Sequence, residues 1–361
     1  MYKLPKLQEF SFPVNKINGS LSSEIASLNK LRVLSLHSNE LTGVIPPEIG
    51  KLSNLELLLL NSNNLNGVLP LPLSNCTKLT VLTLRGNFLT GDLSLFDFSK
   101  FVKLRMIDFG NNAFYGTLPA TLFACKSLIA VRLAMNHLNG EIPQNIQELE
   151  SLSFLSLSNN SLTNVNAAIR ILSRCRSLSI VLLSLNFYDD AMQGDDDDNF
   201  IDSKGFQNLQ VFGLGGCHIS GHIPGWLAKL RKLKVLDLSH NHLTGSIPSF
   251  FGSLPNLFYL DLSQNSLSGN FPVELTRMPR LGSKAIDEVD QTSLHLPVFV
   301  KLENTSNMQY TQISSLPPTP YLRSNNLSGN IPVEISRLKF IHNLDLSDNL
   351  FSGSIPNTFS Y

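Results

Sequence analysis

Four consecutive aspartates at 195–198 are the densest group of side chains in the sequence that could bind a metal ion. Hard cations such as Ca²⁺ favour carboxylate ligands. The run lacks the glycine-anchored ligand spacing of a calcium loop, so a solvated acidic loop is the favoured interpretation. The sequence therefore predicts no metal and no cofactor.

Composition and motifs favour binding over catalysis. Lys plus Arg and Asp plus Glu both number 28, and this balance lacks the basic excess that nucleic acid or an anionic membrane surface requires. The longest apolar run, near residues 55–60, is much too short to span a membrane. No Gly-rich phosphate loop, HRD or DFG motif occurs, so we predict that this chain is not an enzyme.

One sequence template, LxxLxLxxNxLxGxIP, recurs along the chain, for example as LRVLSLHSNELTGVIP from Leu31 and LKVLDLSHNHLTGSIP from Leu233. Its first positions are 7, 31, 55, 79, 104, 128, 152, 178, 209, 233, 257, about 317 and 341. Most are 24 residues apart, a period typical of leucine-rich repeats. The sequence predicts an α/β repeat solenoid, a curved leucine-rich-repeat superhelix of about 13 coils.

The spacing within each repeat predicts the path of one coil. Leu34 and Leu36 alternate as a short strand requires, so we expect them to point inward, with their neighbours facing outward. Asn39 is expected at a buried turn, where its amide can bond backbone groups of adjacent coils. Gly43 permits a tight turn, and Pro46 leads into the outer side of the coil.

The four cysteines are expected to be buried thiols. Cys76, Cys125 and Cys175 each lie three residues before a repeat begins, about two coils apart. Two coils correspond to roughly 10 Å, beyond the ~7 Å that a disulfide spans between Cα atoms. Cys217 occupies the position that asparagine holds in the other repeats.

The repeat is interrupted at three places, where functional information is expected. Repeat seven lacks the G-x-I-P element, and the interval from 178 to 209 carries the acidic run. The third interruption, residues 281–320, contains the strand-like LPVFVKL and is called the island. The template resumes in register after it, so we expect the island to fold onto the inner surface. The predicted parts are repeats at 1–280, the island at 281–320 and repeats at 321–361.

The island and the repeats after it, EVDQTSLHLPVFVKLENTSNMQYTQISSLPPTPYLRSNNLSGNIP, resemble plant tyrosine-sulfated glycopeptide and phytosulfokine receptors. The segment with Cys217 and Trp226 fits the same group, and the resemblance covers essentially the whole chain. It implies a plasma-membrane receptor that binds a tyrosine-sulfated peptide between island and inner surface and recruits a leucine-rich-repeat coreceptor kinase. It places the chain at the cell surface, without membrane contact of its own. The start has no signal-peptide stretch and no membrane span occurs after it, so we expect a piece of a longer protein.

The resemblance directs attention to outward-facing positions and to the island strand. A sulfate group needs Arg or backbone N–H donors, and polar side chains near the island suit a peptide backbone. The outward cations are taken to include Arg85, Arg132 and His240, and Arg85 with Arg132 is expected to form a basic patch. The predicted ligand-binding residues are Arg85, Arg132, Asp237, Ser239, His240, Tyr259, Asp261, Ser263, Gln264, Val298, Phe299, Val300 and Lys301.

Five N-x-[ST] sequons, at Asn18, Asn75, Asn159, Asn304 and Asn326, are candidate glycosylation sites, although an Asn- and Ser-rich repeat also creates sequons by composition. Two other functions stay open. One is a kinase-less decoy, receptor-like fragment or gene remnant. The other is a protein-binding solenoid like the polygalacturonase inhibitors, which the island disfavours.

Overall fold

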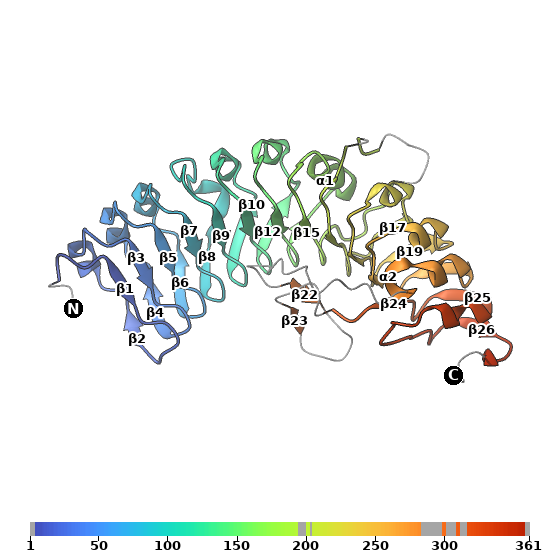
Figure 1. Cartoon of the computed structure of the whole chain (residues 1–361). Coiled ribbons are helices and arrows are strands. Elements are labelled where there is room, and N and C mark those ends of the chain that lie inside the picture. The colour runs from blue at the N-terminus through green and yellow to red at the C-terminus, as the bar shows by residue number, and fades with distance from the viewer. Residues whose placement is uncertain are drawn as a thin grey trace. The chain divides into compact units, whose positions relative to one another are not determined.

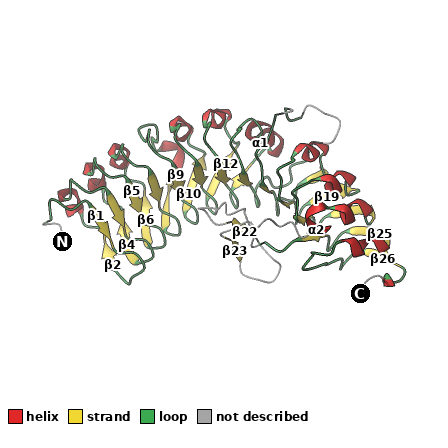
Figure 2. Ribbon diagram, viewed as in Figure 1, coloured by secondary structure: helices red, strands yellow, loops and turns green. Residues whose placement is uncertain are grey.

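The computed structural model describes residues 4–193, 200–202, 204–282, 298–300, 308–310 and 316–357. The chain forms two compact units. Unit 1 comprises residues 1–190 and 201–208, and unit 2 comprises residues 191–200 and 209–361. Each unit is built from stacked coils in which short strands alternate with helical turns (Figure 1, Figure 2). The predicted leucine-rich-repeat solenoid is therefore confirmed.

The inner sheet of unit 1 has one short strand per coil, and neighbouring strands pair in parallel. Each strand begins two residues after a first position of the repeat, as the predicted register requires. Its strands are β1 (Glu9–Ser11), β3 (Val33–Ser35), β5 (Leu57–Leu59), β7 (Val81–Thr83), β9 (Met106–Asp108), β11 (Ala130–Arg132), β13 (Phe154–Ser156) and β15 (Ile180–Leu182).

A second parallel sheet, absent from the sequence prediction, runs along the same coils. After the asparagine turn the chain extends again and pairs with the next coil, as Thr42 does with Asn64. Gly43 sits in this stretch with φ +76°, a conformation that glycine adopts without strain. The strands are β2 (Asn18–Ser20), β4 (Glu40–Val44), β6 (Asn64–Val68), β8 (Phe88–Asp92), β10 (Ala113–Thr117), β12 (His137–Gly140) and β14 (Ser161–Leu162).

Helical turns form the outer side of unit 1, and several come after a proline that fixes the entry of the chain. They are the 3-10 helices η1 (Ser23–Ser27), η2 (Pro47–Lys51), η3 (Leu71–Asn75), η4 (Leu93–Leu95), η5 (Ala120–Ala124) and η6 (Gln144–Glu148). In repeat seven, which lacks G-x-I-P, the helix α1 (Val165–Leu172) replaces the 3-10 turn. Asn164 caps it by accepting a hydrogen bond from the Ala167 N–H.

Unit 2 repeats this architecture. Its inner strands are β16 (Val211–Gly213), β18 (Val235–Asp237), β20 (Tyr259–Asp261) and β24 (Thr319–Tyr321). Its second-sheet strands are β17 (Ser220–His222), β19 (His242–Gly245), β21 (Ser266–Asn270), β25 (Asn326–Asn330) and β26 (Leu350–Ser352). Its helical turns are η7 (Gly225–Lys229), η8 (Ser249–Ser253), η9 (Val273–Arg277), α2 (Pro279–Gly282) and η11 (Val333–Arg337). β24 pairs directly with β20, so the coils resume in register after the island.

Asparagine side chains join successive coils, as the sequence predicts. Asn63 is 6% exposed, and its Nδ2 donates to the Leu36 carbonyl of the preceding coil at 3.0 Å and to the Leu60 carbonyl of its own coil at 3.1 Å. Its Oδ1 accepts from the Leu41 N–H at 3.0 Å. One amide thus satisfies backbone groups of two coils that would otherwise be buried without partners.

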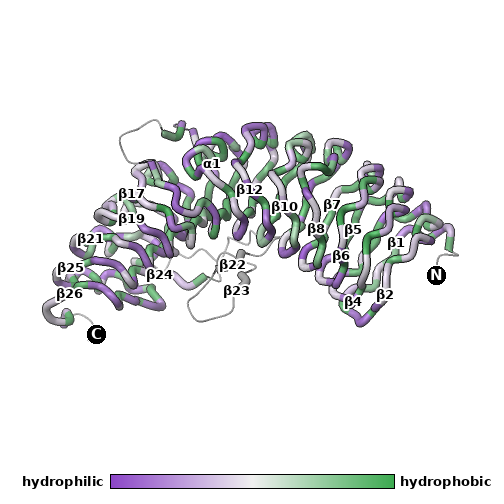
Figure 3. Tube along the Cα trace, turned by 180° about the vertical axis from the view of Figure 1, so that it is seen from behind, coloured by the Kyte–Doolittle hydropathy of each residue, from purple (hydrophilic) through white to green (hydrophobic). Residues whose placement is uncertain are grey.

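Apolar side chains fill the inside of the coils, and apolar residues recur along the chain with the period of the repeat (Figure 3). Leu34 and Leu36 are buried, as expected. Cys76, Cys125, Cys175 and Cys217 are buried free thiols, which confirms the prediction made from their spacing. Burial raises the pKa of Cys76, Cys125 and Cys175 to about 12, so these thiols are inert at neutral pH.

Two further observations concern the described part of the chain. No helix in it is long and apolar enough to cross a membrane. Its residues form no group of three or more His, Cys, Asp or Glu that could hold a metal ion. The acidic run at 195–198 lies outside the described residues.

Candidate functional site

The predicted basic patch of unit 1 contains an acid. Thr83, Asp108 and Arg132 are partners in register on β7, β9 and β11, so Asp108 lies beside Arg132 on the same face of the sheet. The Arg132 Nη1 atom is 3.6 Å from the Asp108 Oδ2 atom. Arg132 holds the outward strand position that the sequence predicts, but it is 3% exposed and ion-paired with Asp108, so it forms no solvent-exposed basic patch with Arg85. Arg85, two residues beyond β7, is half-buried.

The charges in this cluster influence one another. Burial lowers the pKa of Arg132 to about 10, although the charge of Asp108 raises it, and the positive charge of Arg85 lowers it further. Burial raises the pKa of Asp108, while the charges of Arg132 and Arg85 oppose that rise. At neutral pH Arg132 remains protonated. Asp108 was missed in the sequence, although it occupies the same repeat position as Arg132 one coil earlier.

Unit 2 brings the predicted polar residues near the island together. Asp237 and Asp261 are partners in register on β18 and β20, so their carboxylates occupy neighbouring places on one face. The Ser239 hydroxyl donates to Asp237 Oδ1 at 2.7 Å, and the Ser263 hydroxyl donates to Asp261 Oδ1 at 2.6 Å. The Tyr259 hydroxyl reaches Asp261 Oδ2 at 3.5 Å. We call these five residues the acidic row.

The two carboxylates of the acidic row resist ionisation. Burial raises the pKa of Asp261 to about 7, and the neighbouring charge of Asp237 adds to the rise. Burial also raises the pKa of Asp237, while hydrogen bonds from Ser239 and the charge of His240 oppose it. Two like charges on adjacent strands cannot both ionise without mutual repulsion, so the row binds protons more strongly than isolated aspartates do.

Two residues beside the acidic row were not singled out in the sequence. The Tyr321 ring lies 5.5 Å from the Tyr259 ring at an interplanar angle of 59°, and Tyr321 pairs in register with Asp261. Gly215 makes room for Asp237, because a Cβ atom at this position would lie 2.8 Å from Asp237 Oδ1. The signal for Gly215 was its place in GLGGC, where most other repeats carry a side chain.

His240 and Gln264 belong to the turns that end the inner strands. Both have φ +53°, in the left-handed region. The placement of His240 at an outward strand position is therefore corrected to the turn after β18. The His240 N–H donates to the Ser263 carbonyl and the Gln264 N–H donates to the Arg323 carbonyl, both at 2.9 Å. Both residues are half-buried at the edge of the acidic row.

The island contributes a two-stranded antiparallel sheet in its described part. β22 (Val298–Val300) pairs with β23 (Met308–Tyr310), with Phe299 opposite Gln309. Of the predicted strand, 298–300 is thus a strand whose one edge is occupied by β23, and Lys301 lies outside the described residues. The second edge of β22 has no partner strand among the described residues.

Four sequon asparagines, Asn18, Asn75, Asn159 and Asn326, are exposed. Their exposure gives a glycosylating enzyme access, and their modification stays a prediction. Asn304 lies outside the described residues.

Comparison with known proteins identifies proteins that are similar to this chain. Models described as leucine rich repeat match residues 207–267 and 231–282, and further ones match 30–52 and 340–361. Receptor-like protein 3 of Arabidopsis thaliana is 51% identical over 257 residues, covering 71% of this chain and 34% of that protein. Phytosulfokine receptor 1 of Arabidopsis thaliana is 44% identical over 201 residues, 55% of this chain and 19% of the receptor. The chain thus spans about a third or less of these relatives.

Solved structures resemble nearly the whole chain. A TDR receptor superposes with a TM-score of 0.77 at 29% identity, over 99% of this chain and 54% of that one. The Arabidopsis receptor kinase HAESA, in complex with the peptide hormone IDA and the co-receptor SERK1, superposes with a TM-score of 0.68 at 27% identity, over 98% and 56%. Leucine-rich-repeat ectodomains bind ligands and are not enzymes. In its repeats, in its solenoid and in these comparisons the chain is thus similar to plant leucine-rich-repeat receptors and receptor-like proteins.

Proposed function

We propose that this chain is an extracellular peptide-binding module that recognises a tyrosine-sulfated peptide and recruits a leucine-rich-repeat coreceptor kinase. The acidic row of unit 2 carries the proposal, because it brings five residues singled out in the sequence into one polar cluster, of which Asp237 and Ser263 are half-buried. The complex of HAESA with a peptide hormone and a co-receptor supports the general function. The resemblance of the island to sulfated-peptide receptors supports the chemistry of the ligand.

The peptide is proposed to bind along the acidic row and the second edge of β22. A peptide backbone can form hydrogen bonds with three half-buried side chains, Asp237, Ser263 and Gln264. Tyr259 and Asp261 are buried beside them and help to hold them in place. Strand addition to β22 would supply main-chain hydrogen bonds, and side-chain pockets would supply selectivity. For the sulfate we keep Arg85 as a candidate, since Arg132 is committed to Asp108.

Calorimetry with a sulfated peptide and its unsulfated form tests this proposal, on protein produced through a secretory pathway with an added signal peptide. We expect the sulfated peptide to bind at least about tenfold more tightly, the effect of one charge-assisted contact. Asp237→Asn is expected to weaken binding of both forms. Arg85→Ala is expected to weaken the sulfated form alone.

The matched control is Asp97→Asn, because Asp97 accepts the same pair of hydrogen bonds from Ser99 but is exposed in unit 1. It should leave both affinities unchanged. A folded protein that binds neither peptide, or an Asp97→Asn effect as large as that of Asp237→Asn, would contradict the proposal.

A second candidate is a kinase-less, receptor-like or decoy protein, favoured by the 51% identity to Receptor-like protein 3. It shares the peptide-binding step and differs in whether a coreceptor is then recruited. A pull-down with a coreceptor ectodomain in the presence of the sulfated peptide separates the two. Ternary complex formation favours a signalling receptor module, and peptide binding without recruitment favours a decoy.

A further inference from the structure

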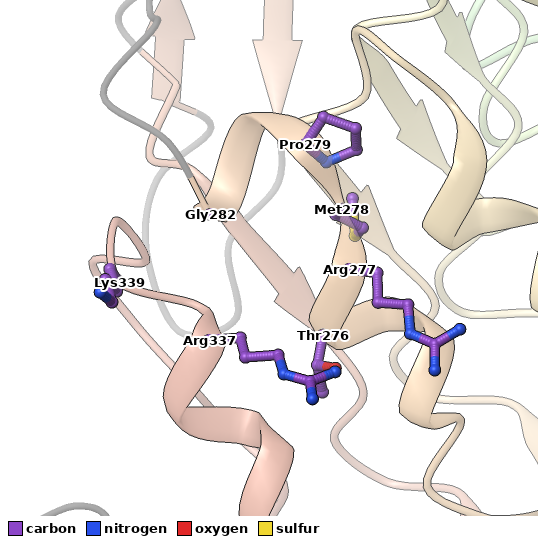
Figure 4. A pocket seen from close by; sticks show the side chains of 7 residues that line it. All are labelled: Thr276, Arg277, Met278, Pro279, Gly282, Arg337 and Lys339. Atoms are coloured by element: carbon purple, nitrogen blue, oxygen red, sulfur yellow. The ribbon is translucent and has the colours of Figure 1, made fainter.

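A basic pocket lies in unit 2 where the regular coils give way to the island. It has a volume of about 490 Å³ and is lined by Thr276, Arg277, Met278, Pro279, Gly282, Arg337 and Lys339 (Figure 4). We propose that this basic pocket binds the anionic groups of an acidic polysaccharide, and that it does so independently of peptide binding.

The pocket arises from a change in the path of the chain. In most coils five residues connect the 3-10 helix to the next inner strand, as residues 52–56 do between η2 and β5. After η9 the chain instead turns through α2, and the next inner strand, β24, comes only after the island. The Phe340 N–H donates to the Leu281 carbonyl at 3.1 Å and holds the segment after η11 against α2. α2 thus forms a recess between η9 and η11.

Three exposed cations border this recess. Arg277 and Arg337 end η9 and η11, the helical turns of coils that are neighbours in the stack, and Lys339 lies two residues after η11. In Figure 4 the Arg337 side chain extends toward Thr276, whereas the Arg277 side chain extends away from Thr276 and Arg337. None of the three cations forms an ion pair within the described residues. Glu274 and Glu334 lie in the first turns of the same helices without neutralising them.

In unit 1, by contrast, two exposed cations form ion pairs with carboxylates of the next coil. The Arg32 Nη2 atom lies 2.8 Å from Glu56 Oε2 of the next coil, and Lys126 pairs with Glu148 of the next coil. In unit 2 the positive charge continues beyond the pocket instead. Lys234 has a lowered pKa, mainly because of burial and also because of the charge of Arg280. Cations on successive coils suit a ligand with charges repeated along a chain.

The chemistry of the lining favours an acidic polysaccharide over a protein partner. Protein interfaces depend on a few large, buried apolar or aromatic anchors. Among the described residues that line this pocket, none is an exposed large hydrophobic residue, and Met278 is fully buried. Guanidinium groups bind carboxylate and sulfate in a bidentate manner, and about 490 Å³ lies within the range of small-ligand pockets.

The test measures binding of the full chain to immobilised oligogalacturonate, dextran sulfate and uncharged dextran. We expect binding to at least one of the two anionic polymers, which separates carboxylate from sulfate recognition, and no binding to dextran. Added salt should weaken the binding, since the pocket is open to solvent. The double variant Arg277→Ser/Arg337→Ser should lose at least about tenfold in affinity, as expected for two charge-assisted contacts.

The matched control is Lys51→Ser/Lys100→Ser, which removes two exposed cations of unit 1 and the same net charge. It should change the affinity less than about twofold, as for unspecific surface charge. Equal losses in both double variants, equal binding to polyglutamate, or no binding by the unaltered chain would overturn the proposal. Binding of the sulfated peptide should be unaffected by Arg277→Ser/Arg337→Ser, so the two proposals can fail separately.

Discussion

Two pairs of charged residues occupy the same repeat position in different units of this protein. In unit 1, Asp108 lies beside Arg132, and in unit 2, Asp237 lies beside Asp261. Each pair sits on adjacent inner strands, and each has at least one nearly buried member. The backbone geometry is therefore the same, and the side chains alone decide the electrostatics. In the first pair each charge favours ionisation of its partner, whereas in the second pair the charge of Asp237 raises the pKa of Asp261.

This difference indicates different uses of the inner sheet. The opposite charges of an ion pair on this face offset each other and leave little net charge to offer a ligand, although the pair is expensive to break. Two carboxylates that raise each other's pKa are stabilised when a ligand supplies a hydrogen-bond donor. The acidic row is therefore the better candidate for binding, and the Asp108–Arg132 pair is the better candidate for a structural role.

The largest expected effect comes from breaking the ion pair. Arg132→Met leaves Asp108 buried without its cation, and we expect it to destabilise unit 1 by about 3–5 kcal/mol. Urea unfolding monitored by circular dichroism measures this change. The double variant Arg132→Met/Asp108→Asn should recover most of the loss, because it removes both charges. Arg32→Met, which breaks an exposed pair, should leave the unfolding midpoint unchanged.

A single-variant effect that the double variant does not reduce would contradict the importance of the ion pair. It would mean that Arg132 stabilises the coil through packing of its aliphatic stem.

The second expected effect is a pH dependence that belongs to unit 2. The pKa of Asp261 is raised to about 7 in the folded chain, so between about pH 4 and pH 7 the folded state binds more protons than the unfolded state. Its contribution to stability is therefore present at low pH and is lost as the pH rises through 7. Asp261→Asn should remove this loss, making the variant about 3 kcal/mol more stable relative to the unaltered chain at pH 8 than at pH 4.5.

Urea unfolding at the two pH values, with Asp97→Asn as the control, checks this prediction. Hydrogen bonds from Ser99 lower the pKa of Asp97, so its contribution to stability changes with pH in the opposite direction to that of Asp261. A difference between unaltered chain and Asp261→Asn that does not vary with pH would show that Asp261 titrates as an ordinary carboxyl group.

The sequence predicted the path of the coils better than the pairing of strands and charged side chains between coils. The period located the inner strands because Leu34 and its equivalents must be buried at fixed intervals, and Asn39 and its equivalents must satisfy two coils. The second sheet was missed because its strands carry few buried apolar residues, such as the single Leu41 of β4, and because their pairing depends on the stacking of coils. The Asp108–Arg132 pair was missed because its partners are 24 residues apart and become neighbours only through the register. The sequence analysis placed His240 on a strand, whereas it lies in the turn after β18.

The smallest expected effect concerns the glycine that makes room for the acidic row. In Gly215→Ala the new methyl group would lie 2.8 Å from Asp237 Oδ1, so the carboxylate must move away from Ser239. We expect a loss of about 1 kcal/mol, since a weakened hydrogen bond is partly offset by the reduced freedom of the unfolded chain. In unit 1, Gly110 holds the same repeat position beside Arg132 of the next coil, but its added Cβ would lie 3.2 Å from the Ala134 carbonyl oxygen. Backbone yields less readily than a carboxylate, so Gly110→Ala should cost more.

Repeating Gly215→Ala in an Asp237→Ala background isolates the contact, because removal of the carboxylate should abolish the loss. If the loss persists, the strain comes from the backbone of the coil and Gly215 has no special relation to the acidic row.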